Sequence, residues 1–235
     1  MLDPVERRGA MTISVIVPAL DEAATLPRTL AAARQAGVRE LIVVDGGSRD
    51  ATVAAARSLA DRVIEGPRGR ALQMNAGATV AQGDVLLFLH ADTRLPPGCA
   101  ALLARALAGP DAVGGRFDVR LDASGLAYRI IERAISLRSR LTGVATGDQA
   151  IFVRRDVFER LGGYPPLPLM EDIALCRALK RAGRMVALRE TVLTSARRWQ
   201  RGGVARTVLV MWALRAAYYA GVRPDRLARV YARTR

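Results

Sequence analysis

The sequence predicts an α/β fold in which a mostly parallel central sheet is flanked by helices. Three observations support this prediction. Short apolar segments alternate with segments of helical periodicity over the first hundred residues, each apolar segment ends in a polar loop, and acidic residues follow three of the four segments. Short, fully apolar strands are typical of parallel sheets that are buried on both faces, and the alternation implies right-handed crossovers.

Four strands and three helices are expected in this first part. The first strand, residues 12–17, is apolar and β-branched and stops at Pro18, which has no N–H to donate to a neighbouring strand. A helix over residues 25–36 follows, with apolar residues at helical spacing, and it ends at Gly37. The other expected elements are strands at 41–44, 62–64 and 85–89 and helices at 50–60 and 69–80.

The second half is expected to be less regular. An alternating strand is predicted within residues 112–121, and an apolar stripe predicts a helix over 126–140. The remaining expected elements are a strand at 150–153, helices at 155–161 and 171–182, and two short strands at 186–188 and 191–195. A basic tail with two amphipathic segments, 204–222 and 223–235, closes the chain.

Composition indicates one globular domain with an appendage and excludes a disordered protein. The 235 residues are 51% hydrophobic and 25% charged, and the formal net charge is +14. Residues 197–235 contain ten arginines and one acid, Asp225, so they carry +9 of that charge. Such a cluster attracts anionic partners, namely nucleic acid, anionic lipid or a phosphorylated substrate. A merely solvated helical surface is the alternative.

Neither a disulfide scaffold nor a secretory signal is expected. Cys99 and Cys176 are too few for a disulfide framework or a structural zinc site, so we expect a reducing cytoplasm. Residues 1–11 have no apolar run and form a short arm. Arg206 and Arg215 interrupt the most apolar segment, and an arginine at the centre of a bilayer costs about 2.5–3.5 kcal/mol.

Three acids are expected to meet at one edge of the sheet. Asp21, Asp45 and Asp92 each follow a predicted parallel strand, and ligands of such sheets bind at the carboxyl ends of the strands. The glycine patterns G-x-G-x-x-G and G-x-x-x-x-G-K-[ST] are absent, which excludes the usual dinucleotide fingerprint and the P-loop. With a single histidine, His90, the chain cannot form a site of several histidine ligands.

The motifs at these positions resemble those of family-2 glycosyltransferases, which have the GT-A fold. They occur in order over roughly residues 12 to 195. The motifs are Ser14-Val15-Ile16-Val17-Pro18 with Asp21-Glu22, Val43-Val44-Asp45-Gly46-Gly47-Ser48, Gly69-Arg70-Ala71, His90-Ala91-Asp92 and Glu171-Asp172. The tail and Gly147-Asp148-Gln149, a candidate acceptor-side loop, are similar to the small bacterial arsenosugar-biosynthesis-type subgroup.

This resemblance implies a site for a nucleotide-diphosphate sugar and a divalent cation, Mn²⁺ or Mg²⁺. Asp92 stands where the family has the metal-binding acid of its D-x-D motif, but His90 replaces the first acid. A neutral imidazole can still bind Mn²⁺, with one negative charge fewer, although His90 can also be a packing residue at the strand end. The residues implied for binding the donor are Pro18, Ala19, Glu22, Asp45, Arg70 and Ala91. Among them, Asp45 is implied to bind the nucleobase.

Glu171-Asp172 matches the catalytic acidic motif of the family. An inverting transfer needs one general base for the acceptor hydroxyl, and we expect Asp172 to be that base with Glu171 orienting a substrate. Two acids that stabilise the dipole of a helix N-terminus are the competing interpretation. The motif Arg197-Arg198-Trp199 is expected to clamp the diphosphate, since guanidinium groups form bidentate bonds with phosphate.

The expected protein is therefore a metal-assisted, inverting glycosyltransferase that transfers a single sugar to a hydroxyl acceptor, such as a lipid or a small metabolite. The expected units are residues 12–196, with a donor half (12–98) and an acceptor half (99–196), and a basic helical extension (197–235). A nucleotidyltransferase and a basic nucleic-acid or membrane-surface binding protein are the alternatives. We expect no nucleic-acid partner, because the aromatic residues of the tail lie mostly in an apolar segment. Peripheral binding at the inner membrane face and a homo-oligomer stay open.

Overall fold

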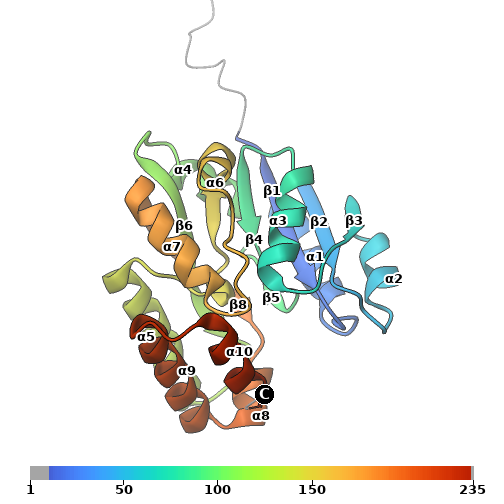
Figure 1. The fold of residues 1–235 in the computed structure, drawn as a ribbon. Coiled ribbons are helices and arrows are strands. Elements are labelled where there is room, and N and C mark those ends of the chain that lie inside the picture. The colour runs from blue at the N-terminus through green and yellow to red at the C-terminus, as the bar shows by residue number, and fades with distance from the viewer. Residues whose placement is uncertain (1–10, 234–235) are drawn as a thin grey trace, which may run out of the picture.

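A computed structural model describes residues 11–233, so residues 1–10 of the expected arm lie outside the described part. One eight-stranded sheet extends through the molecule in the order β3-β2-β1-β4-β7-β6-β8-β5. Helices cover both faces of the sheet, and the C-terminal helices lie beside α5 below it (Figure 1). The predicted α/β class is confirmed.

The first half of the sheet is parallel, as the apolar strands predict. It contains β1 (Ile13–Ala19), β2 (Glu40–Asp45), β3 (Arg62–Glu65) and β4 (Val85–Phe88). Every residue of β1, β2 and β4 is buried, because α1 (Leu26–Gln35), α2 (Thr52–Arg57) and α3 (Arg70–Val80) cover the two faces. The carboxyl ends of these strands therefore lie at one edge.

Close packing fixes α3 on this half of the sheet. A Cβ at Gly77 would lie 2.4 Å from Cγ2 of Ile16, so only glycine allows this approach of helix to strand. At the start of α3, the Gln73 side chain donates to the carbonyls of Ala19 (2.9 Å) and Val44 (2.8 Å), at the ends of β1 and β2. The helix thus joins the two strand ends that the predicted donor site uses.

The second half of the sheet is mixed. The strands are β5 (Thr93–Arg94), β6 (Ala112–Leu121), β7 (Phe152–Arg154) and β8 (Arg184–Thr194). Pairing is parallel only between β6 and β8, whereas β7 is antiparallel to both β4 and β6, and β5 is antiparallel to β8. Neither β5 nor the helix α4 (Cys99–Ala106) was predicted.

The two short strands expected at 186–188 and 191–195 are one strand, and the prediction of a break was wrong. The strand β8 continues through Arg189 and Glu190 beside β6. The register shifts there, from Arg116 opposite Ala187 to Asp118 opposite Thr191. A β-bulge absorbs the extra residues and keeps both ends of the strand paired.

The C-terminal part forms three helices: α8 (Arg197–Gly202), α9 (Val204–Tyr219) and α10 (Pro224–Arg233). Leu214 of α9 and Leu227 of α10 are buried in the same apolar cluster as Leu169 and Ile173 of the sheet-bearing part. The expectation of a one-sided apolar face on residues 204–222 was wrong, because Trp212 is 68% exposed on the side opposite to Leu214. Among residues 11–233, no helix has both the length and the apolar character needed to cross a bilayer.

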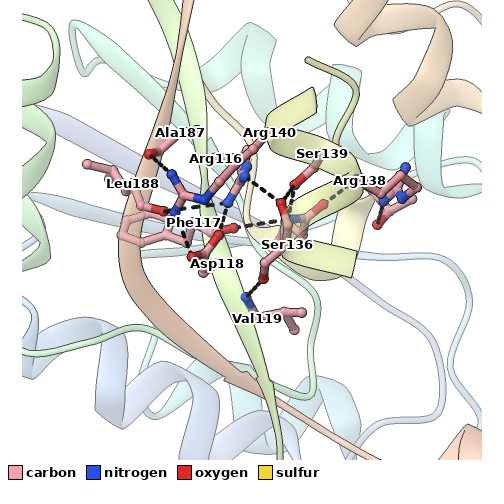
Figure 2. A network of polar contacts seen from close by, with 12 residues as sticks. Arg116, Phe117, Asp118, Val119, Ser136, Arg138, Ser139, Arg140, Ala187 and Leu188 are labelled. Carbon is pink, nitrogen blue, oxygen red and sulfur yellow. Dashed lines mark hydrogen bonds and ion pairs between the residues drawn. The ribbon is translucent and has the colours of Figure 1, made fainter. Parts of the chain in front are cut away.

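A buried polar network fixes α5 (Leu126–Thr142) against β6 and β8 (Figure 2). Arg116, only 3% exposed, and Arg140 both form ion pairs with Asp118. Arg116 also donates to the carbonyl of Ser136 (3.1 Å), and Arg140 donates to that of Leu188 (3.0 Å). A carboxylate shared by two guanidiniums satisfies its buried oxygens, so α5 has one defined position over the sheet.

Three shorter elements complete the chain between α5 and β8. These are a single 3₁₀ turn (Gly147–Gln149), α6 (Arg155–Arg160) and α7 (Glu171–Ala182). The Gln149 side chain is fully buried and donates to Ser139 Oγ (2.9 Å) and to the carbonyl of Phe117 (3.2 Å). These bonds tie the turn to α5 and β6.

Candidate functional site

A cavity of about 830 Å³ opens at the carboxyl edge of the parallel strands. We define its acidic wall as the lining residues of 18–22, 68–73, 90–92, 146–148 and 169–173. We define its basic wall as the lining residues of α5 and α8–α10. The acidic wall contains Asp21, Glu22, Asp92, Asp148, Glu171 and Asp172. The basic wall contains Arg138, Arg197, Arg198, Arg201, Arg206 and Arg215, and among its described lining residues there is no acid.

The cavity brings together twelve of the thirteen residues predicted for the donor, the metal ion, the clamp and catalysis. They are Pro18, Ala19, Glu22, Arg70, His90, Ala91, Asp92, Glu171, Asp172, Arg197, Arg198 and Trp199. These residues come from five separate stretches of the chain, which only the fold brings into contact. Their individual roles stay predictions.

Asp45 is the exception, since it does not line the cavity. It is 3% exposed, and its Oδ2 accepts the N–H groups of Gly47 and Ser48, both at 2.9 Å, while its Oδ1 accepts the Ser48 hydroxyl. Its carboxylate closes the turn after β2, as aspartate commonly does. The Asp45 side chain is thus engaged with its own turn and not directed at a ligand in this structure.

The loop after β1 is held in an unusual backbone conformation. Asp21 has a φ of 54°, which few residues other than glycine, asparagine and aspartate adopt. Its Oδ1 accepts the N–H of Arg49 (2.8 Å), and its own N–H donates to Ser48 Oγ (2.9 Å). The N–H of Glu22 donates to Thr52 Oγ1 (2.8 Å). The loop after β2 therefore holds the loop after β1, with Glu22 on the cavity wall.

The predicted metal ligands His90 and Asp92 both lie on the acidic wall. Burial and the nearby charge of Arg70 lower the pKa of His90, so its imidazole is neutral at pH 7 and has a lone pair to offer. Asp92 Oδ2 accepts a hydrogen bond from Arg197 at 3.0 Å. Among residues 11–233, no group of three or more His, Cys, Asp or Glu side chains is placed to hold a metal ion.

Arg197, the first residue of the predicted Arg-Arg-Trp clamp, contacts the acids of the cavity. Its guanidinium forms ion pairs with Glu22 (2.8 Å) and Asp92 (3.0 Å) and so joins the basic wall to the acidic wall. Arg198, predicted in the same clamp, instead donates to Met211 Sδ and stacks over the ring of Tyr231, 4.8 Å from its centroid. Within the Arg-Arg-Trp motif, the first arginine and not the second faces the acids.

The two acids that begin α7 have different surroundings. Glu171 is 4% exposed, and its Oε1 lies 3.3 Å from Nε of Arg70. Burial raises the pKa of Glu171, although the charge of Arg70 opposes this rise. Met170, directly before them, has a φ of 68°, an uncommon conformation that directs the chain into the helix.

Asp172 is half-buried and is held toward the 3₁₀ turn. Its Oδ2 accepts the N–H of Gly147 at 3.0 Å, and its Oδ1 accepts the N–H of Ile173 at 2.7 Å. A Cβ at Gly147 would lie 2.4 Å from His90 Nε2, so the turn passes directly over the predicted metal ligand. Gly147 thus lies between the predicted base Asp172 and the predicted metal ligand His90.

The family match and the similar proteins both indicate a glycosyltransferase family. Residues 14–162 match the family described as Glycosyl transferase family 2. The undecaprenyl-phosphate 4-deoxy-4-formamido-L-arabinose transferase of Pseudomonas paraeruginosa is 32% identical over 158 residues, which are 60% of this chain and 46% of the relative. The PGL/p-HBAD biosynthesis glycosyltransferase of Mycobacterium bovis is 35% identical over 169 residues, 66% of this chain and 64% of the relative. The chain thus spans about half the length of the first of these relatives.

Solved structures show the same fold at low sequence identity. S. aureus TarS 1–349 in complex with UDP has a TM-score of 0.63 at 18% identity, over 79% of this chain and 60% of that chain. Glucosyl-3-phosphoglycerate synthase from Mycobacterium tuberculosis, solved with Mn²⁺, UDP and glucosyl-3-phosphoglycerate, has a TM-score of 0.57 at 21% identity, over 77% and 70%. The fold is therefore GT-A. Because the family match covers more than half of the sequence, the chain belongs to glycosyl transferase family 2.

Proposed function

We propose that this chain is an inverting glycosyltransferase that moves one sugar from a nucleotide-diphosphate sugar to an acceptor hydroxyl. One observation carries the proposal: Asp92 and Asp172 line the same cavity, close to one another through His90 and Gly147. Structural neighbours that bind UDP or UDP with Mn²⁺ support a nucleotide-sugar donor. We keep the likeness to the arsenosugar-biosynthesis-type subgroup, and the division at residues 98 and 196, as parts of this proposal.

The donor diphosphate fits the region around Asp92. One carboxylate and one neutral imidazole form a donor set that suits Mn²⁺ or Mg²⁺ when phosphate oxygens complete the coordination. Asp92 and His90 would hold this cation, and the cation would stabilise the negative charge of the leaving diphosphate. Arg197 and Arg70 provide further positive charge beside these two residues. We assign the remaining contacts with the donor to Pro18, Ala19, Glu22 and Ala91. The nucleobase of the donor is assigned to the region of Asp45, and Arg198 and Trp199 are assigned to clamp the diphosphate.

Asp172 supplies the general base in this proposal. Its carboxylate accepts the proton of the acceptor hydroxyl while the hydroxyl oxygen attacks the anomeric carbon, and the bond from that carbon to the diphosphate breaks. Since the attack comes from the face opposite the leaving group, the anomeric configuration inverts. The N–H of Gly147 orients the carboxylate, and the ion pair between Glu171 and Arg70 fixes the wall beside it.

Thermal unfolding with a panel of nucleotides tests this function. We would measure the melting temperature with UDP, GDP, dTDP and CMP, each with and without Mn²⁺. A ligand at 100 times its Kd adds about 2.7 kcal/mol of stability. We expect a Mn²⁺-dependent rise with one nucleoside diphosphate, its loss in Asp92→Asn, and its retention in Asp156→Asn, whose acid lies in an exposed pair with Arg160. No rise with any diphosphate would contradict the donor site.

We also propose that α5 and the C-terminal helices contact an anionic membrane surface. Four exposed apolar side chains lie on one face of α5: Leu126, Ile130, Leu137 and Leu141. Leu209 and Trp212 of α9 are each 68% exposed, and arginines surround them in the sequence. Apolar side chains combined with arginine are typical of helices that lie in the membrane interface.

Co-sedimentation with vesicles tests this contact. We expect pelleting with phosphatidylglycerol vesicles, little pelleting with phosphatidylcholine vesicles, and a reduction when Leu137 and Leu141 are both replaced by serine. A matched control is Leu72→Ser on α3, an exposed leucine outside α5 and α8–α10. Equal pelleting with neutral and anionic vesicles would contradict the proposal.

A further inference from the structure

The basic wall holds more positive charge than its described partners neutralise. Nε of Arg215 is buried and has no hydrogen-bond partner among residues 11–233. Burial and the charge of Arg215 lower the pKa of Arg138 to about 10, and the carboxylates of Asp148 and Asp172 offset this only in part. Both side chains are half-buried and line the cavity, and two guanidiniums of like charge repel each other unless an anion joins them.

The surroundings of these two arginines are apolar. The lining residues of α5 next to Arg138 include Ile131 and Ile135, and those of α9 before Arg215 include Val208, Met211 and Trp212. Ile131, Ile135 and Val208 also belong to one apolar cluster with Leu121 and Trp199, so α5 and α9 are packed together here. A ligand on this wall meets positive charge and hydrocarbon side by side.

Arg138 contacts the turn that holds the predicted base, and Arg215 lines the same cavity. Arg138 Nη2 lies 3.4 Å from Thr146 Oγ1, and its Nη1 donates to the carbonyl of Val144 at 3.2 Å. The next residue, Gly147, donates its N–H to Asp172. Arg138 is therefore linked to Asp172 through this turn, whereas the predicted diphosphate partners Arg70 and Arg197 contact His90 and Asp92 directly.

We propose that Arg138 and Arg215 bind the anionic group of the acceptor, and that the acceptor is an amphiphile with a phosphate group beside its reacting hydroxyl. The phosphate lies between the two guanidiniums, and the apolar chain follows Ile131, Ile135 and Trp212. This proposal rests on the proposed function and narrows its acceptor from any hydroxyl compound to a phosphate-bearing amphiphile.

Tryptophan fluorescence reports directly on this wall, because the two tryptophans of the chain, Trp199 and Trp212, both line the cavity. We would titrate the full chain with dodecyl phosphate, inorganic phosphate and dodecyl maltoside, each below its micellar concentration. We expect dodecyl phosphate to bind at least about ten-fold more tightly than either of the others, since only it combines charge and hydrocarbon.

Substitutions then identify the residues. We expect Arg138→Gln and Arg215→Gln each to weaken dodecyl phosphate binding about ten-fold, which is the loss of about 1.4 kcal/mol. Arg138→Lys retains the charge and should recover part of the affinity. Arg133→Gln is the matched control, because this arginine is on α5, exposed and outside the cavity. Circular dichroism and the melting temperature establish that each variant is folded.

Four outcomes would overturn the inference. Equal binding of dodecyl maltoside would mean a purely apolar groove, and equal binding of inorganic phosphate would mean a site for free phosphate. Full competition by UDP would assign the arginines to the donor, and unchanged affinity in both glutamine variants would exclude these residues. Because the UDP and Mn²⁺ melting shift is measured on the same variants, a failed donor site is distinguished from a failed acceptor site.

Discussion

The two walls of the cavity are built in different ways. Most acids of the acidic wall stand at strand ends or at the start of α7, and Asp21, Asp92 and Asp172 accept bonds from neighbouring backbone or arginine. The basic wall consists of helices outside the sheet. Each wall has a buried side-chain atom without a partner among the described residues, Asp148 Oδ1 on the acidic wall and Arg215 Nε on the basic wall. The sheet edge thus holds carboxylates in defined positions, while the outer helices present charge and apolar surface.

This difference has an electrostatic basis. The acidic wall gathers six carboxylates, and Arg70 and Arg197 reduce their mutual repulsion through ion pairs with Glu171, Glu22 and Asp92. The basic wall has no acid of its own among its described lining residues. Opposite charges on facing walls suit a reaction that brings a cation-bound donor to one wall and an anionic acceptor to the other.

The largest effect is expected from Asp172→Asn on the acidic wall. An amide cannot take the proton of the acceptor, so we expect kcat to fall by about 10²- to 10⁴-fold while donor binding stays nearly unchanged. Initial rates together with the UDP melting shift measure the two quantities. Glu159→Gln, on the exposed side of α6, is the control. An unchanged kcat would assign the base to another residue and remove the functional contrast between the walls.

An intermediate effect is expected from Arg197→Gln, which removes the ion pairs that join the basic wall to the acidic wall. This substitution frees the carboxylates of Asp92 and Glu22 from a competing cation, so Mn²⁺ should bind more tightly in the absence of nucleotide. The Arg197 side chain is 39% exposed, and such pairs contribute at most about 1 kcal/mol, so we expect a gain of up to about five-fold. Electron paramagnetic resonance of free Mn²⁺ measures this affinity.

Arg201→Gln provides the comparison for Arg197→Gln, because it removes a charge from the same helix, and among the described arginines it is Arg197 that pairs with Asp92. Weaker Mn²⁺ binding in Arg197→Gln would mean that the arginine supports the metal site and does not compete with it.

The smallest effect is expected from Glu171→Gln and concerns stability against pH. Because the pKa of Glu171 in the folded chain is raised, the folded state holds its proton more tightly than the unfolded chain does. The stability from this group is complete below the ordinary value of 4.5 and is lost as pH rises through the folded pKa. Glutamine does not ionise, so the Glu171→Gln variant does not lose this stability. The free energy of unfolding of the variant minus that of the wild type should therefore increase from pH 4 to pH 7. Urea unfolding measures the difference, and a pH-independent difference would contradict the pKa shift.

Much of the acidic wall could be predicted because its determinants are local. Apolar runs such as residues 12–17 and 41–44 form parallel strands, and the residues just after such strands must lie at one edge. Pro18, Glu22 and Asp92 therefore meet in the cavity, while Asp172, at the start of α7, was expected there from the family motif alone. Asp45 differs, because a short turn let its carboxylate bond to the N–H groups of Gly47 and Ser48.

The basic wall could not be predicted, since it depends on contacts between residues far apart in sequence. The count of arginines in residues 197–235 was visible, but not which of them face the acids. The choice between Arg197 and Arg198 depends on the direction in which α8 leaves β8, and the position of Arg138 depends on the Arg116–Asp118–Arg140 network beneath α5.

By itself, then, the sequence determined the α/β class, the parallel half-sheet and the acids at its edge, because hydrophobic periodicity and turn chemistry act over a few residues. The tertiary structure alone decided the bulged strand β8, the contact of Arg197 with Asp92 and the presence of Arg138 and Arg215 in one cavity. These features depend on how helices pack across the sheet, and packing is a property of the whole chain that no short segment contains.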